Sequence, residues 1–360
     1  MNIKIITIHA MHNPGSVFQC YALQTYLEEQ GCSVQIINYL PKYLFDEHNP
    51  FQYFVKKLLF HKVLKSRGKK FEGFINKELH LTKACYSFEE LVAASYEADL
   101  FLTGSDQLWN GDFICGRDPA YYLKFTDNPN KASFSTSAGK TKIDSQHLER
   151  LKRDLQSFKY ISVRESSTAK ELSDALGREV EWVCDPVFLL KADDYYPFIS
   201  QKNNFGNYVL VYMAPSSPQL DNIVNYYKNK GYTIVLCGGV TSRCKCDVHI
   251  KDSGPEDFLT LIKNAQCVIS TSFHATAFCH IFHVPFITIM PEGNNERIRS
   301  LVDYTGLESR AIELDNNWDI SAISTPIDWE RVDTKIESLI NGSKAYLKKV
   351  ICGINKSENK

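Results

Sequence analysis

The fold is decided by residues 3–39, IKIITIHAMHNPGSVFQCYALQTYLEEQGCSVQIINY. The apolar residues 3–8 predict a buried strand, and the apolar periodicity that ends before Gly31 predicts a helix. Residues 33–39 predict a second strand. Strand, helix and strand in this order make the βαβ unit of a parallel sheet, so an α/β fold is expected.

The same alternation recurs along the rest of the chain. Further strands are predicted over residues 98–102, 131–137, 160–163, 180–183, 208–213, 233–237, 267–270 and 285–289. Helices are predicted over residues 145–158, 167–176, 217–229, 255–264, 274–283 and 295–304. A chain of 360 residues exceeds one hydrophobic core, and the composition changes at residues 191–207. We therefore expect a Rossmann-like domain over 1–190, a second over 207–330, a helix over 331–352 and a disordered tail over 353–360.

Residues 41–97 depart from this alternation and predict a helical insertion in the first domain. Between residues 51 and 70 the insertion interleaves lysine and arginine with apolar side chains. Such a segment is typical of a helix with a solvated basic face. The alternative is a surface that meets anionic lipid or a lipid-linked substrate, which is a peripheral contact with the inner membrane face.

Composition narrows the class of protein. The formal net charge of -1 argues against a nucleic-acid partner. The 11 cysteines are odd in number and many lie in apolar patterns, which indicates a reducing compartment. The N-terminus lacks the features of a signal peptide, and no stretch approaches the ~20 apolar residues of a membrane span. We expect a soluble cytoplasmic protein. Cys244 and Cys246, near His249, have no second ligand pair, so a polar loop without metal is expected.

Candidate site residues follow the predicted strands, where open parallel sheets bind their ligands. The loop at Asn13, Gly15 and Ser16 precedes a helix, whose N-terminal amides suit an anion. A plain turn capped by Ser16 is the alternative. The loop is not a GxGxxG fingerprint, so dinucleotide binding is not expected.

Two later strand ends carry further polar residues. Residues 103–110, TGSDQLWN, follow a buried strand. There Gly104 permits close backbone approach, and Asp106 is either an acceptor for a sugar hydroxyl or a helix cap. Arg164 follows the strand at 160–163 and predicts an anion partner, which is either a ligand or the neighbouring Glu165.

Residues 269–277, ISTSFHATA, are the most informative stretch for chemistry. An apolar strand runs into hydroxyl residues, then into His274 and the start of a helix. His274 and the amides around Ala275 and Thr276 are expected to face a phosphate or carboxylate. Histidine also exchanges a proton near neutral pH.

Together these segments resemble the polysaccharide pyruvyl transferase family over roughly residues 3–312. The resemblance rests on the order and spacing of Asn13-Pro14-Gly15-Ser16 with Gln19, Tyr21-Ala22-Leu23 and Leu27; Gly104-Ser105-Asp106-Gln107 with Trp109; Ser162-Val163-Arg164-Glu165; Asp185-Pro186; and Ser272-Phe273-His274-Ala275-Thr276. Two departures are Pro14, where such proteins often carry another residue, and Ala275, where glycine is common.

The resemblance implies two Rossmann-like domains facing across a cleft, in a GT-B-like arrangement. It implies a bacterial transferase of surface polysaccharide biosynthesis that moves a pyruvyl group from phosphoenolpyruvate to two hydroxyls of one sugar. The products are a cyclic ketal and phosphate. Phosphoenolpyruvate is a co-substrate, no cofactor is implied, and the acceptor sugar is lipid-linked or nucleotide-linked.

By the same resemblance, His274 is the candidate general acid, Arg164 holds the donor's carboxylate or phosphate, and Asp106 or Glu165 activates a hydroxyl. The implied substrate-binding residues are Asn13, Gly15, Ser16, Gln19, Gly104, Ser105, Gln107, Trp109, Glu165, Ser272, Phe273, Ala275 and Thr276. One alternative is a GT-B glycosyltransferase whose nucleotide-sugar donor meets Glu292 and Arg297. Another is a non-catalytic glycan-binding relative.

Overall fold

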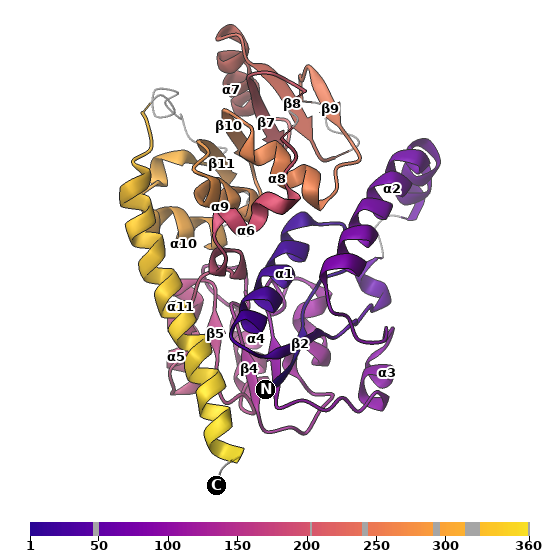
Figure 1. Ribbon diagram of the computed structural model, residues 1–360, viewed down its shortest axis with the longest axis vertical. Helices are drawn as coiled ribbons and strands as arrows, with labels where there is room; N and C mark the ends of the chain where they lie inside the picture. Colours follow the sequence, from indigo (N-terminus) through magenta and orange to yellow (C-terminus); the bar gives the residue numbers. More distant parts are fainter. Residues whose placement is uncertain (46–49, 202–203, 240–243, 291–295, 314–324, 359–360) are drawn as a thin grey trace. The chain divides into compact units, whose positions relative to one another are not determined.

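The computed structural model describes residues 1–45, 50–201, 204–239, 244–290, 296–313 and 325–358, and gives no side-chain positions for residues 50–57 and 355–358. The chain forms two compact units, and most of their helices and strands are labelled in Figure 1. Unit 1 comprises Met1–Asp46, Phe74–Leu190 and Ile336–Lys360. Unit 2 comprises Glu47–Gly73 and Lys191–Lys335.

Unit 1 is built on parallel strands. They are β1 (Asn2–Ile6), β2 (Ser33–Ile36), β3 (Leu100–Thr103), β4 (Lys131–Ser133), β5 (Ser162–Val163) and β6 (Glu181–Trp182). The first four form a sheet in the order β2-β1-β3-β4, and β5 pairs with β6. A parallel bridge between Ala132 and Tyr160 links β4 to the segment before β5. The order reverses between β1 and β3, which makes the carboxyl ends of these two strands a topological switch point.

The helices of unit 1 start and stop at residues that the sequence makes suitable. They are α1 (Pro14–Glu29), α3 (Phe88–Ala93), α4 (Ser145–Asp154) and α5 (Ser166–Leu176), with 3₁₀ turns at Lys42–Leu44, Ile114–Arg117, Pro119–Tyr122 and Pro186–Leu189. The Asn13 side chain caps α1 by accepting from the Gly15 amide at 3.0 Å, and Pro14 stands at the first helical position. Gly31 follows the helix with a φ of 79°, which glycine adopts without strain.

Unit 2 is built on a second parallel sheet. Its strands are β7 (Tyr208–Tyr212), β8 (Thr233–Cys237), β9 (Val248–Ile250), β10 (Cys267–Ser270), β11 (Phe286–Met290) and β12 (Ala311–Glu313). Their order is β12-β11-β10-β7-β8-β9. The two edge strands, β9 and β12, are absent from the predicted strands because each has only three residues and no extended apolar run.

The core of unit 2 lies between this sheet and its helices. The helices are α6 (Ala192–Tyr195), α7 (Pro218–Asn229), α8 (Pro255–Lys263), α9 (Phe273–Phe282) and α10 (Glu296–Thr305), with 3₁₀ turns at Tyr196–Phe198 and Glu308–Arg310. Val211, Leu236, Ile269 and Ile289 come from four different strands and join one buried cluster. A separate cluster in unit 1 includes Phe101 and other side chains from its strands and loops. Each unit therefore has its own hydrophobic core.

Helices α2 (Pro50–Glu78) and α11 (Trp329–Glu358) each contribute residues to both units. The sequence places residues 41–97 in the first domain, whereas the structure groups 47–73 with unit 2. The reason is polar contact: Ser66 donates to Asp252 at 2.6 Å, and Lys70 pairs with Asp257 at 2.9 Å.

The C-terminal helix is longer than the sequence predicts. A disordered tail is expected from residue 353, but α11 continues to Glu358. Val350 and Ile354 are buried, and Lys349 forms ion pairs with Glu179 and Glu181 at 3.1 and 2.8 Å. Burial of the apolar face holds the last turns in place.

His280 in α9 predicts a pH dependence of stability. Its ring is buried, Nδ1 lies 2.8 Å from the carbonyl of Thr276, and burial lowers its pKa to about 4 from an ordinary value of 6.5. As pH falls from 6.5 to 4 the unfolded chain takes up this proton before the folded one does. The free energy of unfolding should then drop by roughly 3 kcal/mol across that window.

Urea unfolding of His280→Leu at several pH values tests this expectation. The fall in stability between pH 6.5 and 4 should be smaller in this variant than in the wild type by roughly 3 kcal/mol, whereas His61→Ala, at an exposed position of α2, should leave it unchanged. An unchanged pH dependence in His280→Leu would assign the effect to other groups.

Candidate functional site

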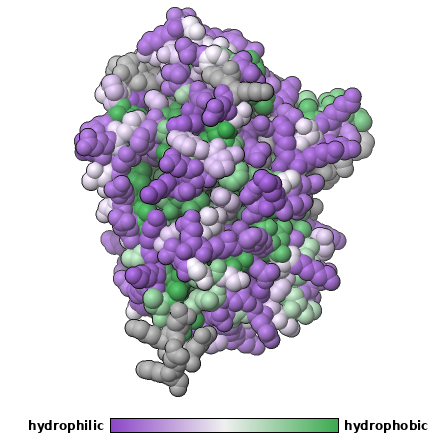
Figure 2. Space-filling model, in the orientation of Figure 1, coloured by the Kyte–Doolittle hydropathy of each residue, from purple (hydrophilic) through white to green (hydrophobic). Residues whose placement is uncertain are grey.

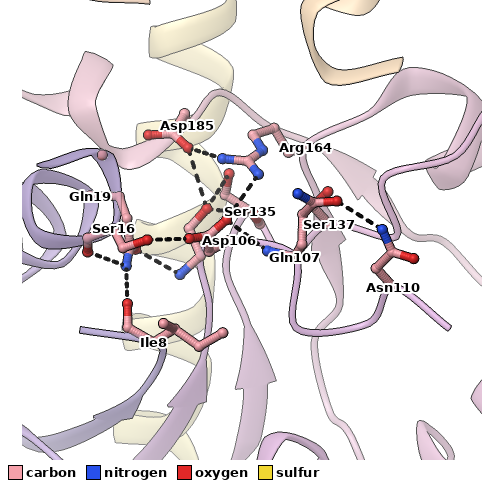
Figure 3. A network of polar contacts seen from close by, with 12 residues as sticks. Ile8, Ser16, Gln19, Asp106, Gln107, Asn110, Ser135, Ser137, Arg164 and Asp185 are labelled. Atoms are coloured by element: carbon pink, nitrogen blue, oxygen red, sulfur yellow. Dashed lines mark hydrogen bonds and ion pairs between the residues drawn. The ribbon is translucent and has the colours of Figure 1, made fainter. Parts of the chain in front are cut away.

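Polar side chains gather at the switch point of the unit 1 sheet (Figure 3). Ser16 lies in the first turn of α1, just beyond β1, and Asp106 follows β3. The Ser16 hydroxyl donates to Asp106 Oδ2 at 2.7 Å. The Gln107 amide donates to the other oxygen, Oδ1, at 2.9 Å. Both carboxylate oxygens are thus fixed by donors from two different strand ends.

Arg164 lies between two carboxylates in this network, as Figure 3 shows. Its Nη1 pairs with Asp185 Oδ2, and its Nη2 is 3.7 Å from Asp106 Oδ1. Arg164 follows β5, and Asp185 follows β6 with its Oδ1 accepting from the Val187 amide at 3.1 Å. The ends of β3, β5 and β6 therefore contribute one charge each to a single cluster.

Hydroxyl groups complete the cluster. Ser105 Oγ donates to the carbonyl of Ser135 at 2.7 Å and lies 3.4 Å from Asp185 Oδ2. Ser137 Oγ donates to Glu165 Oε1. These bonds offset part of the cost of burying three carboxylates around one guanidinium.

Solvent reaches these charges unequally. The exposed fractions are 0% for Glu165, 1% for Asp185, 3% for Arg164 and 9% for Asp106. Burial by itself lowers the pKa of Arg164, but the charges of Asp185 and Asp106 outweigh it and leave that pKa raised. The guanidinium is thus a permanent cation committed to carboxylates. Asp106 is the most accessible of the four charged groups.

Several predicted ligand contacts are structural instead. Trp109 is fully buried, stacks on Tyr122 at 6.2 Å and donates to a backbone carbonyl at 3.3 Å, so it belongs to the core of unit 1. Gln19 is also fully buried and accepts from the Ser105 amide at 3.0 Å. A Cβ at Gly104 would lie 2.1 Å from the carbonyl oxygen of Phe134. Close backbone packing, not ligand approach, requires that glycine.

The remaining predicted residues of unit 1 are Asn13, Gly15 and Gln107, which follow strands β1 and β3 in the chain. Asn13 is exposed while its side chain caps α1, and Gly15 is buried in the first turn. Gln107 is half-buried and accepts from Asn110 at 2.8 Å. Residues 13–16 therefore form a helix-capping turn, with Asn13 rather than Ser16 as the cap.

The bond between Ser16 and Asp106 predicts a measurable contribution to stability. Ser16→Ala removes a buried donor to a carboxylate, which should lower the free energy of unfolding by about 2 kcal/mol. Urea unfolding of the variant checks this value. The exposed Ser33→Ala should change stability by less than about 0.5 kcal/mol. Equal losses in the two variants would contradict the assignment.

A second group lies at the switch point of the unit 2 sheet, where the order reverses between β7 and β10. Thr271 follows β10, and its hydroxyl donates to the carbonyl of Met213, just beyond β7, at 2.8 Å. His274 lies in the first turn of α9 and is buried. Its ring centroid is 5.3 Å from that of Phe273, over which the guanidinium of Arg297 lies at 5.9 Å.

The amides at the start of α9 are already bonded, which corrects the expectation that they face an anion. Ser272 is the N-cap, and its Oγ accepts from the Ala275 amide at 3.3 Å. The Thr276 amide donates to the Ser272 carbonyl at 3.1 Å. Ser272 satisfies both donors as a capping residue does, so the side chains of His274 and Arg297 are left as the cationic candidates at this end of the sheet.

Asp185, Ser135 and Ser137 are absent from the predicted site residues although all three belong to the network. Asp185 had a signal in the sequence, since it lies two residues after a predicted strand and precedes Pro186. The two serines lie beyond the short strand β4 (Lys131–Ser133), inside a segment predicted as strand to residue 137. Because the predicted strand extends too far, the two serines were not recognised as residues that follow a strand.

Two units with parallel α/β sheets of this kind define a GT-B-like protein. Among solved structures, the chain is similar to UDP-N-acetylglucosamine 2-epimerase from Rickettsia bellii, with a TM-score of 0.51, 11% identity, and coverage of 99% of this chain and 97% of that one. It is also similar to the Methanocaldococcus jannaschii UDP-GlcNAc 2-epimerase in complex with UDP-GlcNAc and UDP, with a TM-score of 0.50, 13% identity and coverage of 95% and 93%. These likenesses confirm the GT-B-like fold class.

The family follows from the sequence itself. A family model described as polysaccharide pyruvyl transferase matches residues 13–293. The chain belongs to the polysaccharide pyruvyl transferase family, as its motifs indicate. A comparison with curated proteins gives no match.

Proposed function

We propose that the protein transfers a pyruvyl group from phosphoenolpyruvate to two hydroxyls of one sugar in the synthesis of a surface polysaccharide. Family membership supports the reaction class. The observation that carries the proposal in this chain is the network around Arg164, which leaves Asp106 as its most accessible charge, at 9% exposure. A fixed, partly accessible carboxylate is suited to accept a hydrogen bond from a sugar hydroxyl and to take up its proton.

The reaction balances without a redox partner. Protonation of the donor's methylene carbon makes a methyl group and leaves C2 electrophilic. One sugar hydroxyl adds to C2, the bond from C2 to the phosphate oxygen breaks, and the second hydroxyl closes the ketal. Of the two hydroxyl protons, one becomes the third methyl hydrogen and the other leaves with phosphate. The protein must therefore supply a base, an acid and positive charge for the leaving group.

Asp106 is the proposed base, and Arg164 acts through it. Asp185 and Asp106 already neutralise the buried guanidinium. Direct contact of Arg164 with the donor would require the guanidinium to give up a carboxylate partner, at a cost of several kcal/mol. We therefore assign Arg164 to positioning Asp106, with Glu165 held by Ser137 behind it.

Donor binding and acid catalysis are assigned to unit 2. His274 is the proposed general acid. Arg297 supplies a guanidinium beside the same Phe273 ring, and guanidinium suits the carboxylate and phosphate of phosphoenolpyruvate. No cofactor takes part in the proposed reaction. The acceptor sugar is lipid-linked or nucleotide-linked, and the reaction takes place in the cytoplasm.

A nucleotide-sugar glycosyltransferase is the second candidate. The observation that favours it is the likeness of the fold to a solved epimerase that holds UDP-GlcNAc. Of the two residues predicted for such a donor, Arg297 is described and Glu292 lies outside the described residues. A non-catalytic glycan-binding protein would bind sugar and release no phosphate.

Calorimetric titration of the whole chain with phosphoenolpyruvate tests the proposal. Saturable binding is expected, and His274→Ala and Arg297→Gln should each weaken it by about tenfold or more, the value of one charge-assisted hydrogen bond. The matched controls are His283→Ala, at the exposed end of α9, and Arg299→Gln. Arg299 lies two residues after Arg297 in α10, and its side chain pairs with Glu313 at 2.6 Å. Both controls should bind like the wild type.

The other outcomes separate the candidates. Binding of a UDP-sugar without binding of phosphoenolpyruvate would move the assignment to the glycosyltransferase. Affinity for a glycan, with no phosphate released from any mixture of donor and acceptor, would indicate the binding protein.

A further inference from the structure

Most of helix α2, residues 51–71, has a charge distribution unlike the rest of the chain. Residues 51–71 contain seven of the 41 lysine and arginine side chains and none of the 42 acidic ones, although the chain as a whole is nearly neutral. Neither the network of unit 1 nor the site of unit 2 uses this segment. Charge segregation on one helix points to a partner of opposite sign.

One face of the helix is anchored within unit 2. Ser66 donates to Asp252, Lys70 pairs with Asp257, and the amine of Lys251 lies 5.7 Å from the centroid of the Phe60 ring. These contacts fix the orientation of the helix about its own axis. The lysines at positions 62, 65 and 69 lie on the side of the helix away from the fully buried Phe71 and are exposed to solvent.

The solvent face carries a basic stripe formed by Lys62, Lys65 and Lys69. Their spacing of three and four residues places them on one side of the helix. All three are exposed, and none forms an ion pair with another residue in the described ranges. Within the part of the chain that the structure describes, the stripe therefore presents three charges that no carboxylate neutralises.

Two large apolar side chains lie beside the basic stripe. Leu58 is 71% exposed and Leu59 68%, just before a kink at Phe60, where φ is -118° and ψ is 19°. Figure 2 shows hydrophobic and hydrophilic side chains side by side at the outer part of this helix, at the upper right. Adjacent leucines this exposed are unusual, because each leaves apolar area in water that a partner could cover.

We propose that this face of α2 binds the anionic surface of a lipid bilayer. Lysines attract acidic head groups, while the two leucines reach the boundary with the acyl chains, which is the composition of an interfacial helix. A nucleic acid would use the charge but would leave the leucines in water. No described helix is long and apolar enough to cross a membrane.

Flotation of the whole chain with vesicles tests the proposal. Phosphatidylcholine vesicles that contain phosphatidylglycerol should carry the protein upward, and pure phosphatidylcholine vesicles should carry much less. At roughly 1 kcal/mol for each lysine at such a surface, the substitutions K62Q, K65Q and K69Q together should lower the partition coefficient on the order of 100-fold. L58S with L59S should lower it by roughly tenfold or more.

The matched charge control combines K142Q, K170Q and K348Q, which remove three exposed lysines of unit 1. It has the same net charge as the α2 variant and should float like the wild type. If the α2 variant and the unit 1 control lose flotation equally, net charge alone explains the effect and the proposal is overturned. Equal flotation of the wild type with both kinds of vesicle would also overturn it. Binding of a heparin column without flotation would favour a soluble polyanion instead.

All five substituted α2 side chains are exposed, so each variant should keep the melting temperature of the wild type. Thermal unfolding of each variant checks that loss of fold is not the cause of lost flotation. The inference is separate from the proposed pyruvyl transfer. If the α2 variants stop floating but bind phosphoenolpyruvate normally, the membrane surface is supported whatever the acceptor is. Flotation unaffected by every α2 substitution would overturn it and leave the transferase proposal intact.

Discussion

Replacing Arg164 by methionine is expected to lower the free energy of unfolding by about 3–5 kcal/mol, more than any other single change proposed for this protein. The cause is the pair of carboxylates that the guanidinium neutralises. Asp185 is 1% exposed and pairs with Nη1, and Asp106 lies 3.7 Å from Nη2. Methionine is unbranched and carries no charge, so Asp185 would be left buried without a cation. Urea unfolding measures the loss.

A double-variant cycle isolates the ion pair from the loss of packing. Asp185→Asn alone should also destabilise, but Arg164→Met combined with Asp185→Asn should cost at least about 1 kcal/mol less than the sum of the two. The control is Arg299→Met, whose exposed pair with Glu313 should contribute less than about 1 kcal/mol. Additive losses at Arg164 and Asp185 would show that the two side chains do not act as a pair.

Periodicity and strand-end chemistry predict most of this fold because they are local properties of the sequence. The strands over residues 233–237 and 267–270 have the bounds that their apolar runs predict. The assignment of residues 47–73 to unit 2 is different, since it depends on hydrogen bonds such as that of Ser66 with Asp252, 186 positions away in the chain. No local pattern encodes such a contact.

The candidate site divides in the same way. Asp106 and Arg164 are found from the sequence because each lies in the polar segment that follows an apolar strand. The anion partner of Arg164 could not be predicted from strand ends. The sequence offers the neighbouring Glu165, whereas the structure pairs Arg164 with Asp185 and Asp106. Trp109 is predicted to bind substrate, but aromatic neighbours from other segments bury it in the core. Strand ends predict where polar groups gather, and packing decides which of them reach solvent.

His274→Gln is expected to lower the rate of phosphate release by roughly 10²–10⁴-fold, the range for loss of a general acid or base. Glutamine keeps a hydrogen-bond donor but cannot transfer a proton at neutral pH. Affinity for phosphoenolpyruvate should therefore fall much less than turnover does. The measurement is phosphate release with a sugar acceptor, together with calorimetric binding of the donor by the same preparation.

Two further variants distinguish loss of proton transfer from loss of donor binding. His283→Ala, in the same helix but with its ring paired to Asp333 at 2.9 Å, should release phosphate like the wild type. Arg297→Gln should show the opposite division, with donor affinity falling at least as much as turnover, because a cation held against the donor acts before the chemical step. If His274→Gln loses affinity and turnover in equal proportion, the histidine binds the phosphate and the acid is another group. If neither falls, His274 is a buried residue of the helix start and the proton comes from elsewhere.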